Sequence, residues 1–205
     1  YRKVVVTGAP RIHLGNERPV LRSGGNADTT SNIIVFDDRY SSLKLTAIAA
    51  KLTSDFRIVF KFHPSTVVLD ITKKLPGKSS YDWLLEQNHS SITDLIAKHM
   101  PIAAICCLSG VSIELLKLSI PVILVKSNKY PMVSPLVGKG SSIPLLHSNQ
   151  DVYTEVRLLS ESTDYRRKRI ADGLNIFEQL VKLTGDDATK ALSVLTNDNF
   201  KKTKQ

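Results

Sequence analysis

The hydrophobic positions of this chain gather in short continuous runs, each followed by small or polar residues. The central run, 102–108, is apolar at every position, whereas a strand with one solvated side would alternate. Continuous runs are typical of parallel strands that helices cover on both faces. Shorter stretches at 33–36, 57–62 and 121–125, mostly apolar but with Arg57 and Lys61 in the second, predict further strands. The chain is therefore expected to fold around a parallel central sheet.

Apolar residues at helical spacing separate these strands. They recur every three or four positions between about 41 and 53, which predicts a helix and, with the strand on either side, a right-handed crossover unit. Ser91 precedes Asp94 by three positions, as in a capping box, and opens a predicted helix that ends at residue 100. From residue 149 onward the apolar spacing stays helical.

Three weaker segments complete the pattern. Residues 67–71 predict a further extended piece, and 79–85 predict the start of a helix. Residues 143–146 predict a short edge strand at most, because Pro144 cannot donate to a strand ladder. Together the elements predict an α/β fold, a doubly wound, Rossmann-like parallel sheet of about five or six strands with a helical C-terminal end.

The composition, with 42% hydrophobic residues, is that of a globular protein. No stretch reaches the roughly 18 to 20 consecutive apolar residues that span a membrane, and no signal-peptide pattern is present at the start. A cytoplasmic location is therefore predicted. The two cysteines, Cys106 and Cys107, are neighbours in the central strand and should face opposite sides of the sheet. They predict a reducing compartment, no disulfide and no metal.

The charge of the chain favours an anionic partner. It has 28 basic and 19 acidic residues, a net charge of +9, which suits a nucleotide, a polyanion or an acidic membrane surface. Basic residues cluster at 166–169 and 201–204, but aromatic residues do not interleave with them as single-stranded nucleic acid would require. We interpret the clusters as solvated helix faces and a frayed tail, and we expect no nucleic-acid partner.

Candidate chemistry follows the central strand. Ser109, Gly110 and Ser112 form a turn before a short amphipathic helix that carries Glu114, and ligands of doubly wound sheets bind beyond the carboxyl ends of the strands. Hydroxyl and backbone N–H groups at a helix start suit an anion, and a carboxylate suits a sugar diol. Alternatively, Ser112 caps the helix and Glu114 is an ordinary acid of its first turn.

The motifs, taken in order, resemble a known family. The chain resembles the C-terminal, donor-binding half of a GT-B glycosyltransferase in three features. These are a strand followed by the turn 7–11, a strand ending in His63 and Pro64, and the turn 109–114 before the strand at 121–125. Within that fold the chain resembles most the sialyltransferase, capsule-polymerase and glycerophosphotransferase groups, which carry a His-Pro motif and a serine-rich turn. The resemblance covers nearly the whole chain.

The resemblance implies a function and a domain division. The function is the transfer of a sugar or glycerol phosphate from an activated nucleotide donor in surface polysaccharide or glycan synthesis, in the cytoplasm or at the inner face of the membrane. Residues 1–31 would be a strand and linker from a preceding N-terminal domain, and 32–205 the domain that binds the nucleotide donor. A glycan or polysaccharide acceptor would bind through the preceding domain, with an acidic membrane surface as a further candidate contact.

The resemblance also implies which residues bind the donor. His63, with Pro64, would contact the phosphate or base side of a nucleotide. The turn residues Ser109, Gly110 and Ser112 would hold phosphate oxygens. No separate cofactor or metal is expected, and donors linked to CMP or CDP are preferred over those linked to UDP.

Three charged residues complete the implied donor site. Glu114 would bind the ribose. Lys61, on the same strand face as His63 by the period of two, and Arg39, in the loop after 33–36, would add positive charge. A loop-capping role for His63 and a surface role for Arg39 remain open.

Departures from the family keep other functions open. Asp37 and Asp38 stand where dinucleotide sites carry a Gly-rich loop, and acids beside a pyrophosphate repel it unless a cation or Arg39 intervenes. No catalytic residue is assigned, and the chain alone is expected to bind a nucleotide without catalysing transfer. The alternatives are a UDP-sugar 2-epimerase-like enzyme, which shares a Ser-Gly turn before a Glu-bearing helix, and a non-catalytic basic module that binds a polyanion.

Overall fold

The fold is a parallel sheet between two helical layers. The computed structural model describes residues 31–38, 40–63, 84–86, 91–107, 110–127, 136 and 142–180, and these ranges contain a sheet of six strands in the order β3-β2-β1-β4-β5-β6. All five strand pairs in it are parallel. The strands are β1 (Asn32–Phe36), β2 (Arg57–Lys61), β3 (Leu84–Glu86), β4 (Ala103–Cys106), β5 (Val122–Val125) and β6 (Leu145–Leu146). The predicted doubly wound parallel sheet is confirmed.

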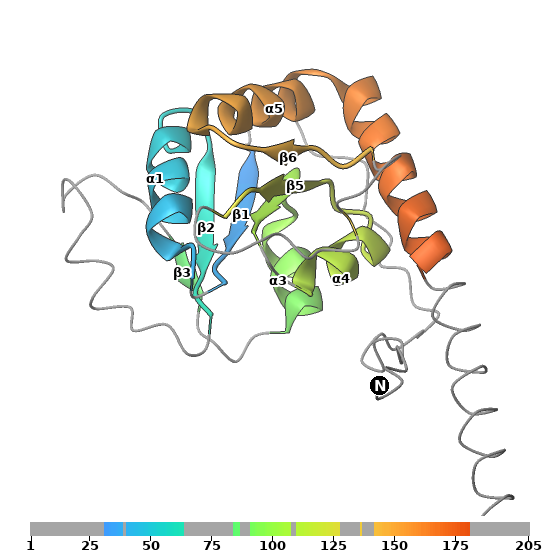
Figure 1. The fold of residues 1–205 in the computed structure, drawn as a ribbon, viewed down its shortest axis with the longest axis horizontal. Helices are drawn as coiled ribbons and strands as arrows, with labels where there is room; N and C mark the ends of the chain where they lie inside the picture. Colours follow the sequence, from blue (N-terminus) through green and yellow to red (C-terminus); the bar gives the residue numbers. More distant parts are fainter. Residues whose placement is uncertain are drawn as a thin grey trace, which may run out of the picture.

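Helices cover both faces of the sheet (Figure 1). They are α1 (Ser42–Leu52), α3 (Ile92–His99), α4 (Val111–Lys117) and α5 (Asn149–Glu161), and a further helix covers 163–180. Because the chain winds from β1 through α1 toward β2, and from β4 through α4 toward β5 on the other side, right-handed crossovers place α1 and α4 on opposite faces. The helical C-terminal end is confirmed through residue 180.

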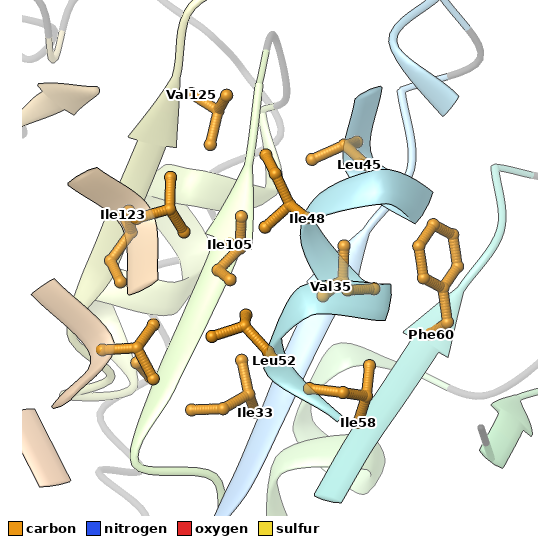
Figure 2. Packing of buried hydrophobic residues seen from close by; sticks show 14 of the residues in the cluster. Ile33, Val35, Leu45, Ile48, Leu52, Ile58, Phe60, Ile105, Ile123 and Val125 are labelled. Carbon is orange, nitrogen blue, oxygen red and sulfur yellow. The ribbon is translucent and has the colours of Figure 1, made fainter. Parts of the chain in front are cut away.

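The core has two layers that the strands share. Alternate residues of β1 belong to different layers: Ile33 and Val35 pack under α1 and α5, whereas Ile34 and Phe36 pack under α3 and α4. The first layer is drawn in Figure 2, with Ile33, Val35, Leu45, Ile48, Leu52, Ile58, Phe60, Ile105, Ile123 and Val125 labelled. Both faces are buried, which explains why the strand sequences are apolar without alternation. The neighbouring cysteines obey this rule, since Cys107 lies in the first layer and Cys106 in the second.

The helix on 163–180 wraps around the β6 side of the sheet (Figure 1). Tyr165, near its start, packs on the first layer, and Phe177, near its end, packs on the second. Arg169 lies between them and is only 6% exposed. Our reading of the basic cluster 166–169 as a solvated face is therefore wrong for Arg169. Its neighbour Arg167 is exposed and pairs with Asp164 at 3.5 Å.

Most predicted ends of elements hold. Ser91 caps α3, and its hydroxyl accepts a hydrogen bond from the Asp94 backbone N–H at 3.1 Å. Helix α1 lies within the predicted range 41–53, and β6 is a two-residue edge strand. The helix expected from 79–85 is wrong at Leu84 and Leu85, which belong to β3 and pair with Val59 and Phe60 of β2. Three residues carry no period, so tertiary pairing decides their conformation.

Some predicted segments cannot be compared. The N-terminal strand and linker up to residue 30, the extended piece at 67–71 and the helical spacing beyond 180 lie outside the described residues.

Candidate functional site at the carboxyl edge

The sheet reverses its winding direction between β1 and β4. Strands β2 and β3 follow β1 on one side, and β4, β5 and β6 lie on the other, which is the strand order of dinucleotide-binding folds. Ligands of such folds bind where the direction reverses, outside the carboxyl ends of the strands. Asp37 and Asp38 follow β1, His63 follows β2, Gly110 follows β4 and Ser127 follows β5. We call these five residues the carboxyl-edge site.

Asp38 shapes the loop between β1 and α1. Its Oδ1 atom accepts hydrogen bonds from the backbone N–H groups of Tyr40, at 3.0 Å, and Ser41, at 2.7 Å. Ser41 is the N-cap residue of α1, but its own side chain makes no capping bond. The Asp38 side chain therefore stabilises the turn that leads into α1, by accepting from the backbone two and three residues later, which is a common role of Asp in turns. The same turn leaves Tyr40 52% exposed beside the site.

Asp37 joins the ends of β1 and β2. Its Oδ1 atom accepts from the Ser42 hydroxyl at 2.6 Å, and its Oδ2 atom accepts from the His63 backbone N–H at 3.3 Å. The Asp37 N–H donates to the Lys61 carbonyl at 2.9 Å. Asp37 and Asp38 are 5% and 6% exposed. Both carboxylates, expected from the sequence only to repel a phosphate, thus organise the loops of the site.

A second cluster ties α1 to the ends of β4, β5 and β6. The Ser41 hydroxyl donates to the Ser127 hydroxyl at 3.4 Å. The Lys44 ammonium donates to the carbonyls of Lys126, at 2.8 Å, and His147, at 3.0 Å. Burial raises the pKa of the neighbouring Cys107 thiol to about 12, although a hydrogen bond with Ser41 opposes the shift. Buried cysteines with a raised pKa are unreactive, so we expect Cys107 to have a packing role.

The structure places five of the eight residues that the sequence proposed for donor binding. His63 is exposed, and Lys61 is half-buried two residues before it. Phe60 and Phe62 face the first core layer and Val59 the second, so the alternation of β2 places Lys61 on the α3–α4 face, and His63 follows the end of the strand. Arg39, Pro64 and Ser109 lie outside the described residues.

The start of α4 differs from one of the two readings of Ser112. Helix α4 begins at Val111, and its N-cap residue is Gly110, which has no side chain that could cap the helix. Ser112 is the second helical residue and is buried, so the interpretation of Ser112 as the cap is wrong. The predicted cap, Ser112, and the observed N-cap, Gly110, are only two positions apart, and sequence patterns do not locate a helix end more precisely than that.

Gly110 borders open space. A Cβ atom built on this residue meets no heavy atom within 4 Å in the described chain, and its φ of −58° and ψ of −22° are ordinary for any residue. Glu114, one turn into α4, is exposed, and partial desolvation raises the pKa of its carboxyl against the opposing charge of Lys117. The hydrogen bonds described above join His63 to Asp37, but none of them joins His63 to Gly110 or Glu114.

The sequence analysis missed Ser41, Ser42, Lys44 and Ser127. It considered Asp37 and Asp38 only as charges that would repel a pyrophosphate. The signal that could have found them is position, because each follows a predicted strand or opens the next helix. Within the described ranges, no group of three or more His, Cys, Asp or Glu side chains could hold a metal ion. None of the helices in those ranges has the length and apolarity needed to cross a membrane.

Comparison with known proteins identifies the fold. No family model and no curated protein matches the sequence. Among solved structures, TarM matches 80% of this chain with a TM-score of 0.53 and 13% identity, and the GtfA/B complex matches 82% with a TM-score of 0.54 and 9% identity. UDP-GlcNAc 2-epimerase from Neisseria meningitidis, bound to UDP-GlcNAc, matches 77% with a TM-score of 0.52 and 16% identity.

These likenesses concern part of each neighbour. The matched region covers 35% of TarM, 44% of the epimerase and 36% of the GtfA/B chain. At such low identity a likeness establishes the fold alone. TarM and GtfA/B are GT-B glycosyltransferases, and the described chain accordingly has a GT-B-like, Rossmann-like fold.

Proposed function

We propose that this chain is the donor-binding domain of a GT-B glycosyltransferase, which transfers a sugar or glycerol phosphate from a nucleotide donor in surface polysaccharide or glycan synthesis. The observation that carries the proposal is the reversal of the sheet between β1 and β4. There, one aspartate links the exits of β1 and β2, and open space adjoins Gly110 after β4. The GT-B-like fold of the neighbours supports the same assignment.

The donor would lie across the carboxyl edge. Its phosphate would contact His63 of the His-Pro motif and the backbone of the turn at 109–112, since the side chain of Ser112 is buried. The ribose would contact Glu114, and Lys61 and Arg39 would supply positive charge. The His-Pro motif favours a cytidine nucleotide over a uridine nucleotide. The acceptor would bind on a preceding domain, in the cytoplasm or at the inner face of the membrane.

Titration calorimetry with CMP, UMP, GMP and AMP tests the proposal. We expect the pyrimidine nucleotides to bind, with CMP tightest, and to raise the melting temperature. A ligand at 100 times its Kd stabilises by about 2.7 kcal/mol. Absence of heat with every pyrimidine nucleotide at millimolar concentration would refute the proposal.

Two variants at His63 and His147 test the donor contact. His63→Ala should cost about 1.5 to 3 kcal/mol of CMP binding, the usual range for a hydrogen bond to a charged group. His147 is also exposed but follows the edge strand β6, so His147→Ala is the matched control and should bind CMP as the parent does. Equal affinities in both variants would assign His63 a structural role.

Two variants at Gly110 test whether the phosphate lies before α4. Asp and Asn are both better N-cap residues than Gly, and a Cβ atom at this position meets no heavy atom of the described residues within 4 Å. Both variants should therefore keep the melting temperature of the parent. Gly110→Asp should weaken CMP binding more than Gly110→Asn, because only the aspartate repels a phosphate. If the two variants bind CMP equally, no phosphate lies at this position.

A UDP-sugar 2-epimerase-like enzyme is the second candidate. The observation in its favour is the fold shared with the Neisseria meningitidis epimerase, whose structure holds UDP-GlcNAc. Binding of UDP-GlcNAc without any response to cytidine nucleotides would favour this candidate over the first.

A further inference from the structure

The carboxylate of Asp37 contacts two segments that are distant in sequence. Ser42, in the first turn of α1, donates to one oxygen at 2.6 Å, and His63, 26 positions away, donates its backbone N–H to the other at 3.3 Å. The Asp37 N–H also donates to the Lys61 carbonyl. One residue thus connects the exit of β1, the start of α1 and the exit of β2.

We propose that Asp37 is a positioning residue for His63, with Ser42 holding the carboxylate in place. This inference rests on the proposed donor-binding function. The β1–β2 register ends at Lys61, so His63 lies beyond the ladder that fixes β2. Phe62 is buried and anchors the chain on one side, while the Asp37 carboxylate holds the next backbone N–H. The His63 ring is thereby carried by a backbone fixed relative to the rest of the carboxyl edge.

The short bond from Ser42 matters because a carboxylate rotates about its last side-chain torsion, which has only broad preferences. With Oδ1 held by the Ser42 hydroxyl, Oδ2 faces the His63 N–H. Removal of the Ser42 hydroxyl should free this rotation, while the Asp37 carboxylate stays buried and helix α1 stays largely intact. Ser42→Ala is therefore a milder perturbation than Asp37→Ala.

The neighbouring serine offers a matched control. Ser41 is equally buried, and its hydroxyl donates to Ser127 after β5. Ser41→Ala deletes the same hydroxyl from the adjacent residue and leaves the hydrogen bond between Ser42 and Asp37 in place. A general loosening of the loop would affect both serine variants alike, whereas positioning of His63 involves Ser42 alone.

A double-mutant cycle with CMP, measured by calorimetry on the whole chain, tests the inference. Ser42→Ala should lower CMP affinity about 3- to 10-fold, less than the loss expected for His63→Ala, because the ring remains and only its positioning is weakened. In the His63→Ala background it should lower affinity less than about 2-fold, because the group it positions is gone. Ser41→Ala should have the same effect in both backgrounds. Asp37→Asn should restore part of the affinity lost in Asp37→Ala, since its amide oxygen can accept from His63.

The outcomes separate this inference from the proposed function. If the parent chain binds no nucleotide, the proposed function fails. If the parent binds CMP and His63→Ala has no effect, or Ser42→Ala lowers affinity equally in both backgrounds, positioning by Asp37 is overturned. The inference is also overturned if the three single variants Ser42→Ala, Asp37→Asn and Asp37→Ala all bind CMP as tightly as the parent. Melting temperatures of each variant show whether Asp37→Ala folds, and the Ser42 cycle decides the question if it does not.

Discussion

The substitution Arg169→Met should destabilise the fold more than any surface substitution, because Arg169 holds a buried network. Its Nε atom lies 3.1 Å from Glu155 Oε1, and its terminal nitrogens donate to the carbonyls of Ser142 and, at 3.1 Å, Val122. The Tyr165 hydroxyl donates to the same carboxylate at 2.9 Å. The arginine therefore links the last helix, α5, β5 and the approach to β6.

The expected loss follows from what Arg169→Met leaves behind. The methionine fills most of the volume, but the Glu155 carboxylate, with a side chain only 11% exposed, loses its counter-charge, and two carbonyls lose a donor. Removing one partner of a buried pair costs about 3 to 5 kcal/mol, a large share of a typical total of about 5 to 15 kcal/mol. At about 2 to 4 °C per kcal/mol for a chain of this size, the melting temperature should fall by about 6 to 20 °C.

Urea unfolding followed by circular dichroism measures this loss. Arg167→Met is the matched control, since its side chain is 75% exposed in a 3.5 Å pair, and should cost less than about 0.5 kcal/mol. The double variant Arg169→Met with Glu155→Met should recover part of the loss, because no unpaired charge remains. A loss below about 1 kcal/mol in Arg169→Met alone would contradict the buried network.

Four further outcomes are expected. Phe60 belongs to the first core layer and is fully buried, so Phe60→Ala should cost about 3 to 5 kcal/mol in urea unfolding; a loss under about 1 kcal/mol would mean that the layer collapses around the gap. Ser91→Ala removes the side-chain cap of α3 and should cost about 1 kcal/mol in the same assay, and an unchanged urea midpoint would show that the cap contributes nothing. Burial raises the pKa of both thiols, that of Cys107 to about 12, so iodoacetamide at pH 8 should label neither in the folded chain and both in urea; rapid labelling of the native chain would contradict this. The raised pKa of the Glu114 carboxyl means that the folded chain binds this proton more tightly than the unfolded chain, so the stability of the fold falls as pH rises through the shifted pKa. Glu114→Gln should therefore be more stable than the parent at pH 7 but not at acid pH. A variant that is less stable than the parent at pH 7 would refute the reasoning.

The elements were predictable where the sequence carried an uninterrupted signal. Strands β1, β2, β4 and β5 are apolar runs bounded by turn residues, and burial on both faces produces such runs. Strand β3 has three residues at the edge of the sheet, too few to show a period, and pairing with β2 decides its conformation. The order of the strands has no local signature in the sequence. It depends on which connection leads back across β1, and here the one from β3 to β4 does so.

The place of His63 and Gly110 in the fold could be predicted, because each follows a strand and parallel strands bring their carboxyl ends to one edge. Their binding roles stay predictions, and the hydrogen bonds around them could not be predicted. The role of Asp37 depends on a contact with a backbone group 26 positions away, which a sequence pattern does not contain. The same holds for Arg169, whose partners lie 14, 27 and 47 positions away and which looks like any exposed arginine in a basic run.

The aspartates also change how the charge of the chain bears on its ligand. The net charge of +9 attracts anions to the molecule as a whole, yet two buried aspartates, Asp37 and Asp38, stand at the end of β1. A phosphate at this edge must therefore be held by directed donors, from His63 and from backbone N–H groups, more than by the summed positive charge. Binding through a few such donors loses little affinity as salt rises, whereas a polyanion held by many lysines and arginines loses it steeply. The salt dependence of CMP binding should accordingly be shallow, and a steep dependence would point to the basic surface instead of the carboxyl edge.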